Sequence, residues 1–405
     1  MKKLIALLLL TALVLGGCAA SPAAPIPNAA GVSVNLMANI TAKPVADASD
    51  TGSLSKAATD FSVALLKNAA ESGKTVVLSP YSVMQALGMT ANGAKGETLQ
   101  QLELALGMPI AELNKAFAAV QPDSAFQNAN ALWFRDDGSL EVSSDFLQAC
   151  ADYYGADAYA APFDESTRTD INQWVSDHTD QRIPEMLKEL RSNAALYLVN
   201  ALCFEGKWVE PYSEDAIWDG VFYAADGSEQ NARMMSSEEA LYLKDGSATG
   251  FLKPYAGGRY SLAAILPNGS LDDYVQKLDG DALRALIDGA SDDPVQAVLP
   301  QLELKSDCEL ADALRALGIN DLFDDSADLS GIDGKQDLSV GRVLHSAVLR
   351  VDENGTEAAA STVEEIEMMG LRETYSVVLD HPFLLVIWDN QTQLPVFLAA
   401  VNSVR

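Results

Sequence analysis

The stretch VDENGTEAAASTVEEIEMMGLRETYSVVLDHPF, residues 351–383, decides how this chain is interpreted. It begins as a strand and reaches a turn whose last residue is Gly355. Small and β-branched residues follow from Thr356 to Thr362, and then acidic and methionine-rich sequence. The side chains of this segment are too small and polar for a core, and the segment is too rich in alanine and β-branched residues for a simple linker. Its side chains suit a strand that enters an existing sheet without clashes.

Strand periodicity gives this segment two faces. The face toward a packed interior would hold Thr356, Ala358, Ala360 and Thr362. The opposite face would hold Glu357, Ala359 and Ser361. Gly355 supplies the backbone freedom that a hinge needs. By the same alternation Glu364 faces inward, where an unpaired carboxylate costs several kcal/mol. An exposed alanine-rich loop would explain the composition, but neither the alternation nor the position after the turn.

The length of the chain limits the number of domains, and its charge limits the kinds of partner. The chain has 405 residues, enough for one large domain or two ordinary ones, and 48% of them are hydrophobic. The formal net charge of −30 argues against nucleic acid, because phosphate binding needs clusters of Lys and Arg. The same charge favours either attraction of basic partners or simply a solvated acidic surface.

The first residues predict export and a lipid anchor. Lys2 and Lys3 precede an apolar run, Leu4 to Leu15, which is too short to span a bilayer and typical of a signal peptide. The sequence Leu-Gly-Gly-Cys that follows resembles the bacterial lipobox, with Cys18 as the lipidated residue. An ordinary signal peptide with an incidental cysteine is the alternative. We therefore expect a signal peptide over 1–17, a lipidated amino terminus and flexible tether over 18–53, and attachment to the outside of the bacterial cell membrane.

The rest of the chain predicts one α+β domain over residues 54–405. Helical apolar spacing dominates to about residue 190, and continuous apolar runs typical of covered strands follow, without any fixed repeat. Three further cysteines, Cys150, Cys203 and Cys308, lack the spacing of a disulfide framework or a zinc site, so buried thiols are expected.

Catalytic and cofactor motifs are missing from the sequence. It contains neither the H-E-x-x-H pattern of zinc proteases nor the G-x-S-x-G turn of serine hydrolases. The stretch NGAKGET, residues 92–98, lacks the spacing of a phosphate loop and follows a helical pattern. We expect no enzyme activity, no metal and no cofactor.

Several blocks, taken together in chain order, resemble the serpins. They are VVLSPYSVMQALGMTANGAKGETLQQL, INQWVSDHTDQRIPEML, LVNALCFEGKW, YSLAAILP, ALGINDLFDDSADLSGI, VDENG followed by GTEAAAST, and DHPFLLVIWDNQTQLPVFLAAVNS. The resemblance covers the chain from about Leu54 to Arg405. It implies three β-sheets, eight to nine helices, and an exposed reactive-centre loop at about 353–376 that can insert into the central sheet.

The resemblance also implies a function, that of an irreversible suicide-substrate inhibitor of serine endopeptidases. The protease attacks the loop, forms an acyl-enzyme and is trapped when the severed loop inserts into the sheet. Counting fourteen positions from Gly355 gives Met369 as the acyl donor and Gly370 as the leaving side. Met368, Leu371 and Arg372 are the alternatives. A medium, unbranched Met suits elastase-like enzymes, and chymotrypsin- or subtilisin-like enzymes less well.

Further positions take structural roles from the resemblance. The hinge comprises Glu353, Gly355, Thr356, Glu357, Ala358, Ala359, Ala360, Ser361 and Thr362. The polar shutter beneath the opening sheet and the aromatic residue at the breach are Ser82, Asn200, His345 and Trp208. Family members that pair the hinge glutamate with lysine differ from this chain, which has Gln301 at that position, so the ion pair of Glu353 is expected to be missing.

The resemblance leaves one alternative function. A non-inhibitory serpin would act as a binding protein at the cell surface, although such members carry bulky or charged residues where this chain has TEAAAST. No basic helix of the heparin-binding kind is present in the sequence, so heparin is not an expected partner. We expect a monomer whose partners are serine proteases, basic ones above all.

Overall fold

The computed structural model describes residues 32–45, 51–120, 125–138, 140–191, 194–356 and 374–405. All of them belong to one structural unit, Gly31–Arg405. Among these residues, no helix is both long and apolar enough to cross a membrane.

The largest sheet, sheet A, has six strands. Their order is β1 (Val34–Asn35), β4 (Asp157–Ala161), β3 (Phe126–Arg135), β5 (Leu196–Phe204), β14 (Val340–Val351) and β13 (Leu302–Glu309). Every residue of β5 is buried. Its alternate side chains enter two cores: Leu198 and Leu202 belong to the main core, and Val199 and Ala201 to a second one. A strand covered on both faces requires such a nearly continuous apolar run, which in β5 is interrupted by Asn200.

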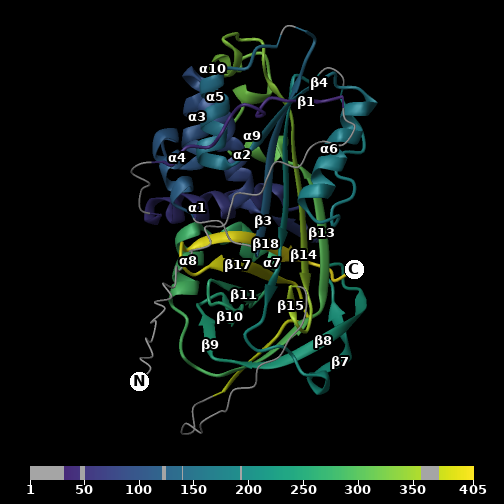
Figure 1. Ribbon diagram of the computed structural model, residues 1–405. Coiled ribbons are helices and arrows are strands. Elements are labelled where there is room, and N and C mark those ends of the chain that lie inside the picture. The colour runs from purple at the N-terminus through teal and green to yellow at the C-terminus, as the bar shows by residue number, and fades with distance from the viewer. Residues whose placement is uncertain (1–31, 46–50, 121–124, 139, 192–193, 357–373) are drawn as a thin grey trace, which may run out of the picture. The chain divides into compact units, whose positions relative to one another are not determined.

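The other sheets lie in the lower half of Figure 1, at the height that the lower ends of the long strands of sheet A reach. Sheet B has the order β2 (Val76–Leu78), β18 (Leu394–Val401), β17 (Phe383–Asp389), β11 (Tyr260–Pro267), β10 (Ala248–Pro254) and β9 (Leu241–Lys244). Sheet C has the order β16 (Tyr375–Val378), β12 (Val295–Pro300), β8 (Glu229–Glu239) and β7 (Ile217–Tyr223). A two-stranded sheet joins β15 (Gly355–Thr356) to β6 (Gly206–Lys207). The predicted architecture of three main sheets in an α+β fold is confirmed.

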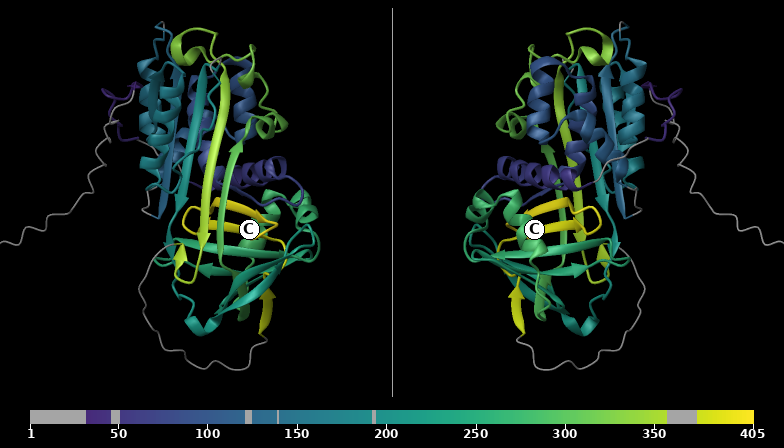
Figure 2. Two further views of the ribbon diagram at one scale, coloured as in Figure 1. Left: turned by 90° about the vertical axis from the view of Figure 1, so that its right-hand side faces the viewer. Right: turned by 90° about the vertical axis from the view of Figure 1, so that its left-hand side faces the viewer.

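Helices cover both faces of sheet A, as Figures 1 and 2 show. The helices of the described residues are α1 (Gly52–Ala69), α2 (Pro80–Gly93), α3 (Gly96–Leu106), α4 (Ile110–Ala119), α5 (Ser144–Tyr154), α6 (Glu165–His178), α7 (Leu271–Lys277), α8 (Gly280–Asp288), α9 (Ala311–Ala316) and α10 (Ser330–Asp333). Of these, α7 and α8 lie against sheet B, where they contact β11 and β9. The described residues thus contain ten α-helices, more than the eight to nine expected, because short segments such as α10 are counted. Helix α6 lies on one face of the sheet, and the group around α2 lies on the other.

Local chemistry explains why α2 begins where it does. Ser79 caps the helix, since its side chain accepts a hydrogen bond from the backbone of Ser82. Pro80 follows at the first helical position, where its missing N–H costs nothing. Helix α2 packs against β3 and β5, and its cap Ser79 lies next to His345 of β14.

The expected tether, residues 18–53, needs correction over residues 32–45. Within that range Val34 and Asn35 form β1, which pairs with the edge of β4. The Ser33 hydroxyl donates a hydrogen bond to Asp170 at 2.5 Å, and the Lys43 backbone N–H donates one to Asp152 at 2.6 Å. The sequence of this range has little hydrophobic periodicity and gave no sign of the contact. The contact depends on backbone groups, on carboxylates distant in the chain, and on three apolar side chains packed against the main core, Leu36, Met37 and Ile40.

Candidate functional site

The hinge is a tight turn at the end of β14. The Asp352 N–H donates to the carbonyl of Gly355 at 2.9 Å, and the Asn354 N–H donates to the Asp352 side chain at 2.8 Å. Gly355 has φ of +138°, which L-residues rarely adopt, and a Cβ there would lie 2.1 Å from the Gly206 carbonyl oxygen. Only glycine fits this position.

Beyond the turn, the chain already pairs with β6, the short strand that follows β5. In β15, Gly355 lies opposite Lys207 and Thr356 lies opposite Gly206, in antiparallel register. The residues of β6 come directly after β5, so β15 stands at the point where β5 and β14 end (Figure 1). Strands β5 and β14 are hydrogen-bonded to each other in parallel, with His345 opposite Asn200. A strand that continued from β15 would therefore have to enter between them.

Trp208 and Tyr212 hold the turn from outside. The Trp208 indole N–H donates to the carbonyl of Asp352 at 2.9 Å, and its backbone N–H donates to that of Asn354 at 3.0 Å. The Tyr212 backbone N–H donates to the carbonyl of Glu353 at 2.8 Å. Three successive carbonyl groups of the turn are thus fixed by two aromatic residues. Trp208 therefore lies beside the hinge turn, and its role at the breach during insertion stays a prediction. Tyr212 was not among the predicted residues.

Glu353 has a partner, although not a cation. The Gln301 side chain donates to Oε2 of Glu353 at 2.7 Å. Where other members form an ion pair between lysine and the hinge glutamate, this chain forms a hydrogen bond from the neutral Gln301 to the charged Glu353.

Gln301→Lys is expected to stabilise the hinge slightly, because an ammonium group would replace the amide beside Glu353. The gain should be no more than about 1 kcal/mol, as for other accessible pairs. Thermal unfolding of both proteins at low and high salt measures it. A gain that persists unchanged at high salt would contradict an electrostatic origin.

The predicted shutter is centred on His345, which is fully buried. Its Nδ1 lies 2.8 Å from Asn200 Oδ1, and its Nε2 accepts a hydrogen bond from the Ser79 backbone N–H at 3.0 Å. An accepting Nε2 requires the neutral ring with its proton on Nδ1. Burial, the largest cause, lowers the pKa of His345 from 6.5 to about 4. Ser82, the other predicted member, is buried one turn into α2, where its backbone N–H donates to Ser79 Oγ at 3.4 Å.

This lowered pKa predicts an acid-sensitive sheet. Above pH 6.5 the ring is neutral in both folded and unfolded chains, so it adds no pH dependence. As the pH falls toward 4, only the unfolded chain takes up the proton, and stability should drop by about 2 kcal/mol between pH 7 and pH 5. Urea unfolding of the wild type and His345→Asn over this range measures the loss. Equal slopes in the two proteins would contradict the assignment.

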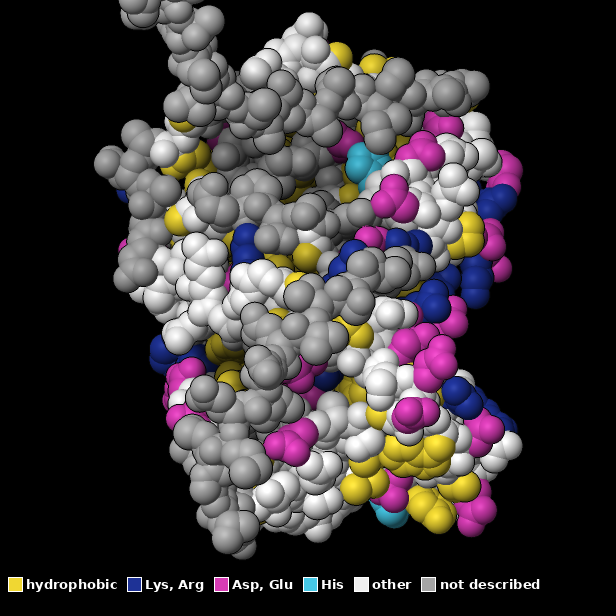
Figure 3. Space-filling view, turned by 60° about the horizontal axis from the view of Figure 1, so that its bottom comes forward, with side chains coloured by type: hydrophobic (Ala, Val, Ile, Leu, Met, Phe, Trp, Pro, Cys, Tyr) yellow, Lys and Arg dark blue, Asp and Glu magenta, His cyan; other side chains and the backbone are white. Residues whose placement is uncertain are grey.

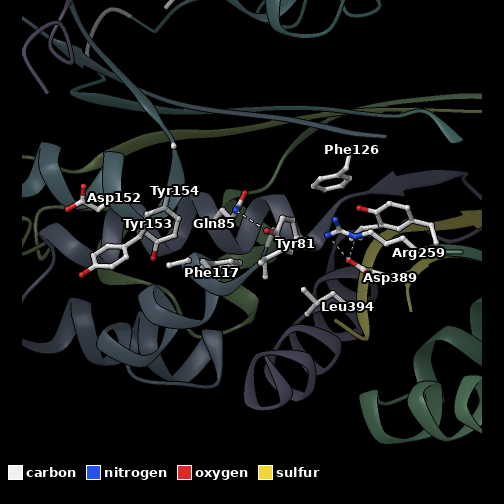
Figure 4. Close-up of a pocket in the computed structure, with 15 residues that line it drawn as sticks. Tyr81, Gln85, Phe117, Phe126, Asp152, Tyr153, Tyr154, Arg259, Asp389 and Leu394 are labelled. Atoms are coloured by element: carbon white, nitrogen blue, oxygen red, sulfur yellow. Dashed lines mark hydrogen bonds and ion pairs between the residues drawn. The ribbon is translucent and has the colours of Figure 1, made fainter. Parts of the chain in front are cut away.

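The shutter continues across the sheet as a chain of amides. Asn200 donates to Asn130 on β3, and Asn130 donates to Gln85 Oε1 at 3.0 Å. Gln85 in turn donates to the Tyr81 hydroxyl at 3.2 Å. Gln85 and Tyr81 line a cavity of about 330 Å³, whose wall also includes Phe117, Phe126 and the Arg259–Asp389 ion pair (Figure 4). A buried polar chain therefore links strands β14, β5 and β3 to helix α2.

Sequence reasoning missed Asn130, Gln85 and Tyr81. A signal for the first was present, since Asn130 is a polar residue inside the apolar strand NANALWF. A buried amide in such a strand needs a partner, but its position 70 residues from Asn200 gave no means of naming that partner.

Several predicted residues lie outside the described part of the chain. They are Cys18, Glu357, Ala358, Ala359, Ala360, Ser361, Thr362, Glu364, Met368, Met369, Gly370, Leu371 and Arg372. The structure does show where their neighbours lie: Thr356 on β15 precedes the segment, and Tyr375 on β16 follows it. Their proposed roles stay predictions.

Comparison with known proteins is consistent across sequence and structure. Residues 56–404 match the family model described as "Serpin (serine protease inhibitor)". The chain is 32% identical over 375 residues to the leukocyte elastase inhibitor of Bos taurus, covering 86% of this chain and 99% of that protein. It also matches the thermophilic serpin tengpin in the native state, with a TM-score of 0.86 and 37% identity over 92% of this chain and 99% of that one.

Tengpin in the latent state matches less well, with a TM-score of 0.75 and 33% identity over 90% of this chain and 100% of that one. The described residues thus follow the native arrangement more closely than the latent one. Members of the family are generally protease inhibitors and not enzymes. On the family match and these relatives, the chain belongs to the serpins.

Proposed function

We propose that this serpin irreversibly inhibits serine endopeptidases and uses the segment after Thr356 as bait. The observation that carries the proposal is β15. The chain turns back at Gly355 and already pairs with β6 at the end where β5 and β14 lie side by side. A non-inhibitory surface role would give no reason for a strand that starts there.

Insertion is favourable for a reason that the sheet itself supplies. Strands β5 and β14 are parallel, and the chain that leaves β14 through a tight turn runs antiparallel to both. One parallel pairing is then replaced by two antiparallel ones, which are slightly more stable per residue. Additional backbone hydrogen bonds and buried alanine methyl groups contribute further.

The reaction begins as ordinary proteolysis. The serine Oγ of the protease attacks the carbonyl carbon of Met369, the Met369–Gly370 bond breaks, and the new amino group of Gly370 takes up a proton. The ester between serine and Met369 remains. Insertion of the upstream segment then moves the attached protease before water can hydrolyse the ester, so one inhibitor is consumed for each protease trapped.

An elastase-like target has two supports. Met369 is medium in size and unbranched, which suits a small apolar pocket. The bovine relative is named an elastase inhibitor. Met368, Leu371 and Arg372 remain alternative acyl donors, and the last of these would shift the target to trypsin-like enzymes.

The test is to mix the purified protein with pancreatic elastase and examine the products on a denaturing gel. We expect an adduct that survives SDS and a released peptide that begins at Gly370, identified by mass spectrometry. Elastase whose catalytic serine is replaced by alanine is the control and should form no adduct. Complete cleavage of the loop without any adduct would contradict the proposal.

Association with basic proteases should depend on salt. The net charge is −30, yet on the face in Figure 3 acidic side chains lie among basic ones, without one large acidic patch. Attraction then comes from the whole molecule, and the association rate should fall by about tenfold from low to high salt. Stopped-flow kinetics measures this. A rate independent of salt would contradict electrostatic attraction.

We also propose that Cys18 carries lipid that holds the domain outside the bacterial membrane. The support is the lipobox-like sequence before it. Labelling of cells with a palmitate analogue should mark the wild type and leave Cys18→Ser unlabelled. Equal labelling of both would contradict the anchor.

A further inference from the structure

A buried ion pair lies behind the hinge. Lys253 on β10 and Glu239 at the end of β8 are joined by a contact of 2.7 Å between Nζ and Oε1. Their side chains are only 1% and 6% exposed. The Ser237 hydroxyl donates a further hydrogen bond to Oε1 of Glu239 at 2.5 Å. A lysine so completely buried is rare and requires a charged partner.

The ammonium group of Lys253 also faces two aromatic rings. It lies 4.4 Å from the centre of the Tyr212 ring and 5.3 Å from that of Trp208. Trp208 is also stacked on Tyr255, with ring centres 4.3 Å apart. Cation–π contacts of this kind are strongest when the cation is shielded from water. The cation therefore helps to fix the positions of both rings.

Those two residues are the ones that hold the hinge turn. Trp208 and Tyr212 donate to the carbonyl groups of Asp352, Glu353 and Asn354, directly before β15 begins. The rings of Trp208 and Tyr212 thus connect the ammonium group of Lys253 to the residues that bond to the turn.

Stability alone does not explain the pair. A buried ion pair can often be exchanged for neutral residues of similar volume without loss, because desolvation of two charges offsets their attraction. Removal of one partner, in contrast, leaves an uncompensated charge and is strongly destabilising. The pair therefore has a role that a neutral pair of the same size would not fill.

We propose that Lys253 is a positioning residue for the inhibitory reaction, acting through Trp208 and Tyr212 to set the register in which β15 starts to enter the sheet. The proposal rests on the proposed inhibitory function. Thr356 already pairs with Gly206, and insertion continues from that pair. Insertion competes with hydrolysis of the acyl-enzyme, so a turn held less firmly delays the pairing of the residues that follow Thr356. A larger share of encounters then ends in simple cleavage.

The informative variant is Lys253→Met/Glu239→Gln, in which both charges are removed together and the volume is kept. The single change Lys253→Met would leave Glu239 buried without its cation and could fail to fold. The matched control is Arg259→Met/Asp389→Asn. That pair has a contact of 3.0 Å, side chains 17% and 2% exposed, and a ring contact of 5.2 Å to Tyr260, so its ring contact is to a residue other than Trp208 and Tyr212.

Two measurements on the intact protein test the proposal. Hydrogen exchange of the backbone amides in residues 205–213, which include those of Trp208 and Tyr212, should quicken by about tenfold in the hinge-side variant and stay unchanged in the control. With elastase, the stoichiometry of inhibition should rise by about tenfold while the association rate stays the same, because the exposed bait is unaltered.

The outcomes separate this proposal from the proposed function. Wild-type protein that forms no adduct contradicts inhibition, and the exchange measurement still decides whether Lys253 holds the turn. Adduct formation by the wild type together with unchanged exchange and stoichiometry in the hinge-side variant overturns the positioning role. Equal changes in the control variant also overturn it, because they would show a general effect of losing a buried pair.

Discussion

Cleavage of the bond between Met369 and Gly370 is expected to raise the midpoint of thermal unfolding by roughly 15 °C. The freed segment adds a strand between β5 and β14, with a net gain of roughly 12 backbone hydrogen bonds at about 1 kcal/mol each. For a domain of this size, each kcal/mol added to the free energy of unfolding raises the midpoint by about 1.3 °C. Circular dichroism of the intact and the cleaved protein measures the shift.

A hinge variant provides the control. Thr356→Arg places a long charged side chain at the pair with Gly206, from which insertion has to continue, and should keep the cleaved protein at the midpoint of the intact one. Cleaved wild type that melts no higher than intact protein, with its severed segment still open to exopeptidases, would rule out insertion. A surface binding role would then be the better account.

The register of the inserted strand follows from pairs that already exist. Thr356 lies opposite Gly206, so continuation along β5 places Thr362 opposite Asn200. The bridge between Asp352 and Gly355, continued along β14, places the same Thr362 opposite His345. His345 and Asn200 are direct neighbours now. Insertion should therefore separate the shutter pair and set the Thr362 hydroxyl between its two members.

The sequence could predict this site to the extent that its chemistry is local. Gly355 was recognisable because a turn after a strand needs its conformation, and β5 because nine consecutive buried residues leave a continuous apolar run. His345 and Asn200 are polar residues inside such runs, and the resemblance to the serpins assigned them to the shutter. Each of these signals lies within a few residues of the position that it identifies.

The remaining features depend on distant pairing. Lys253 lies in FLKPY, which has the composition of an ordinary strand with one exposed lysine, and only the packing of β8 against β10 brings Glu239 to it. Gln301 was expected to leave Glu353 without its ion pair, but the hydrogen bond that replaces the pair depends on side-chain geometry. The contact of residues 32–45 with β4 is formed partly by backbone pairing, which has no signature in side-chain type.

Glu364→Ala is expected to lower the stoichiometry of inhibition, by as much as about a hundredfold if the wild type is mostly cleaved as a substrate. The continued register sets Glu364 between Leu198 and Val343, which are 0% and 1% exposed and belong to the main core. A carboxylate there must be buried without a cation or take up a proton, at a cost of several kcal/mol. That cost falls on insertion and not on the attack of the protease.

Glu365→Ala is the matched control, because the neighbouring residue faces the other side of the sheet. The same register sets it between Tyr197 and Arg342, and the Arg342 side chain is 18% exposed. A carboxylate beside a partly exposed guanidinium has little to gain from removal. We therefore expect Glu365→Ala to trap elastase as the wild type does, and the two variants differ only in the face that loses its charge.

Titration of a fixed amount of elastase with each protein gives the stoichiometry, and the association rate should be the same in all three. The cleaved form of Glu364→Ala should also melt above the cleaved wild type, since the same carboxylate no longer opposes the inserted strand. A wild-type stoichiometry already near one would show that the sheet accommodates the charge. Equal improvement in both variants would place the effect in protease recognition, because the two carboxylates share the bait but not the buried face.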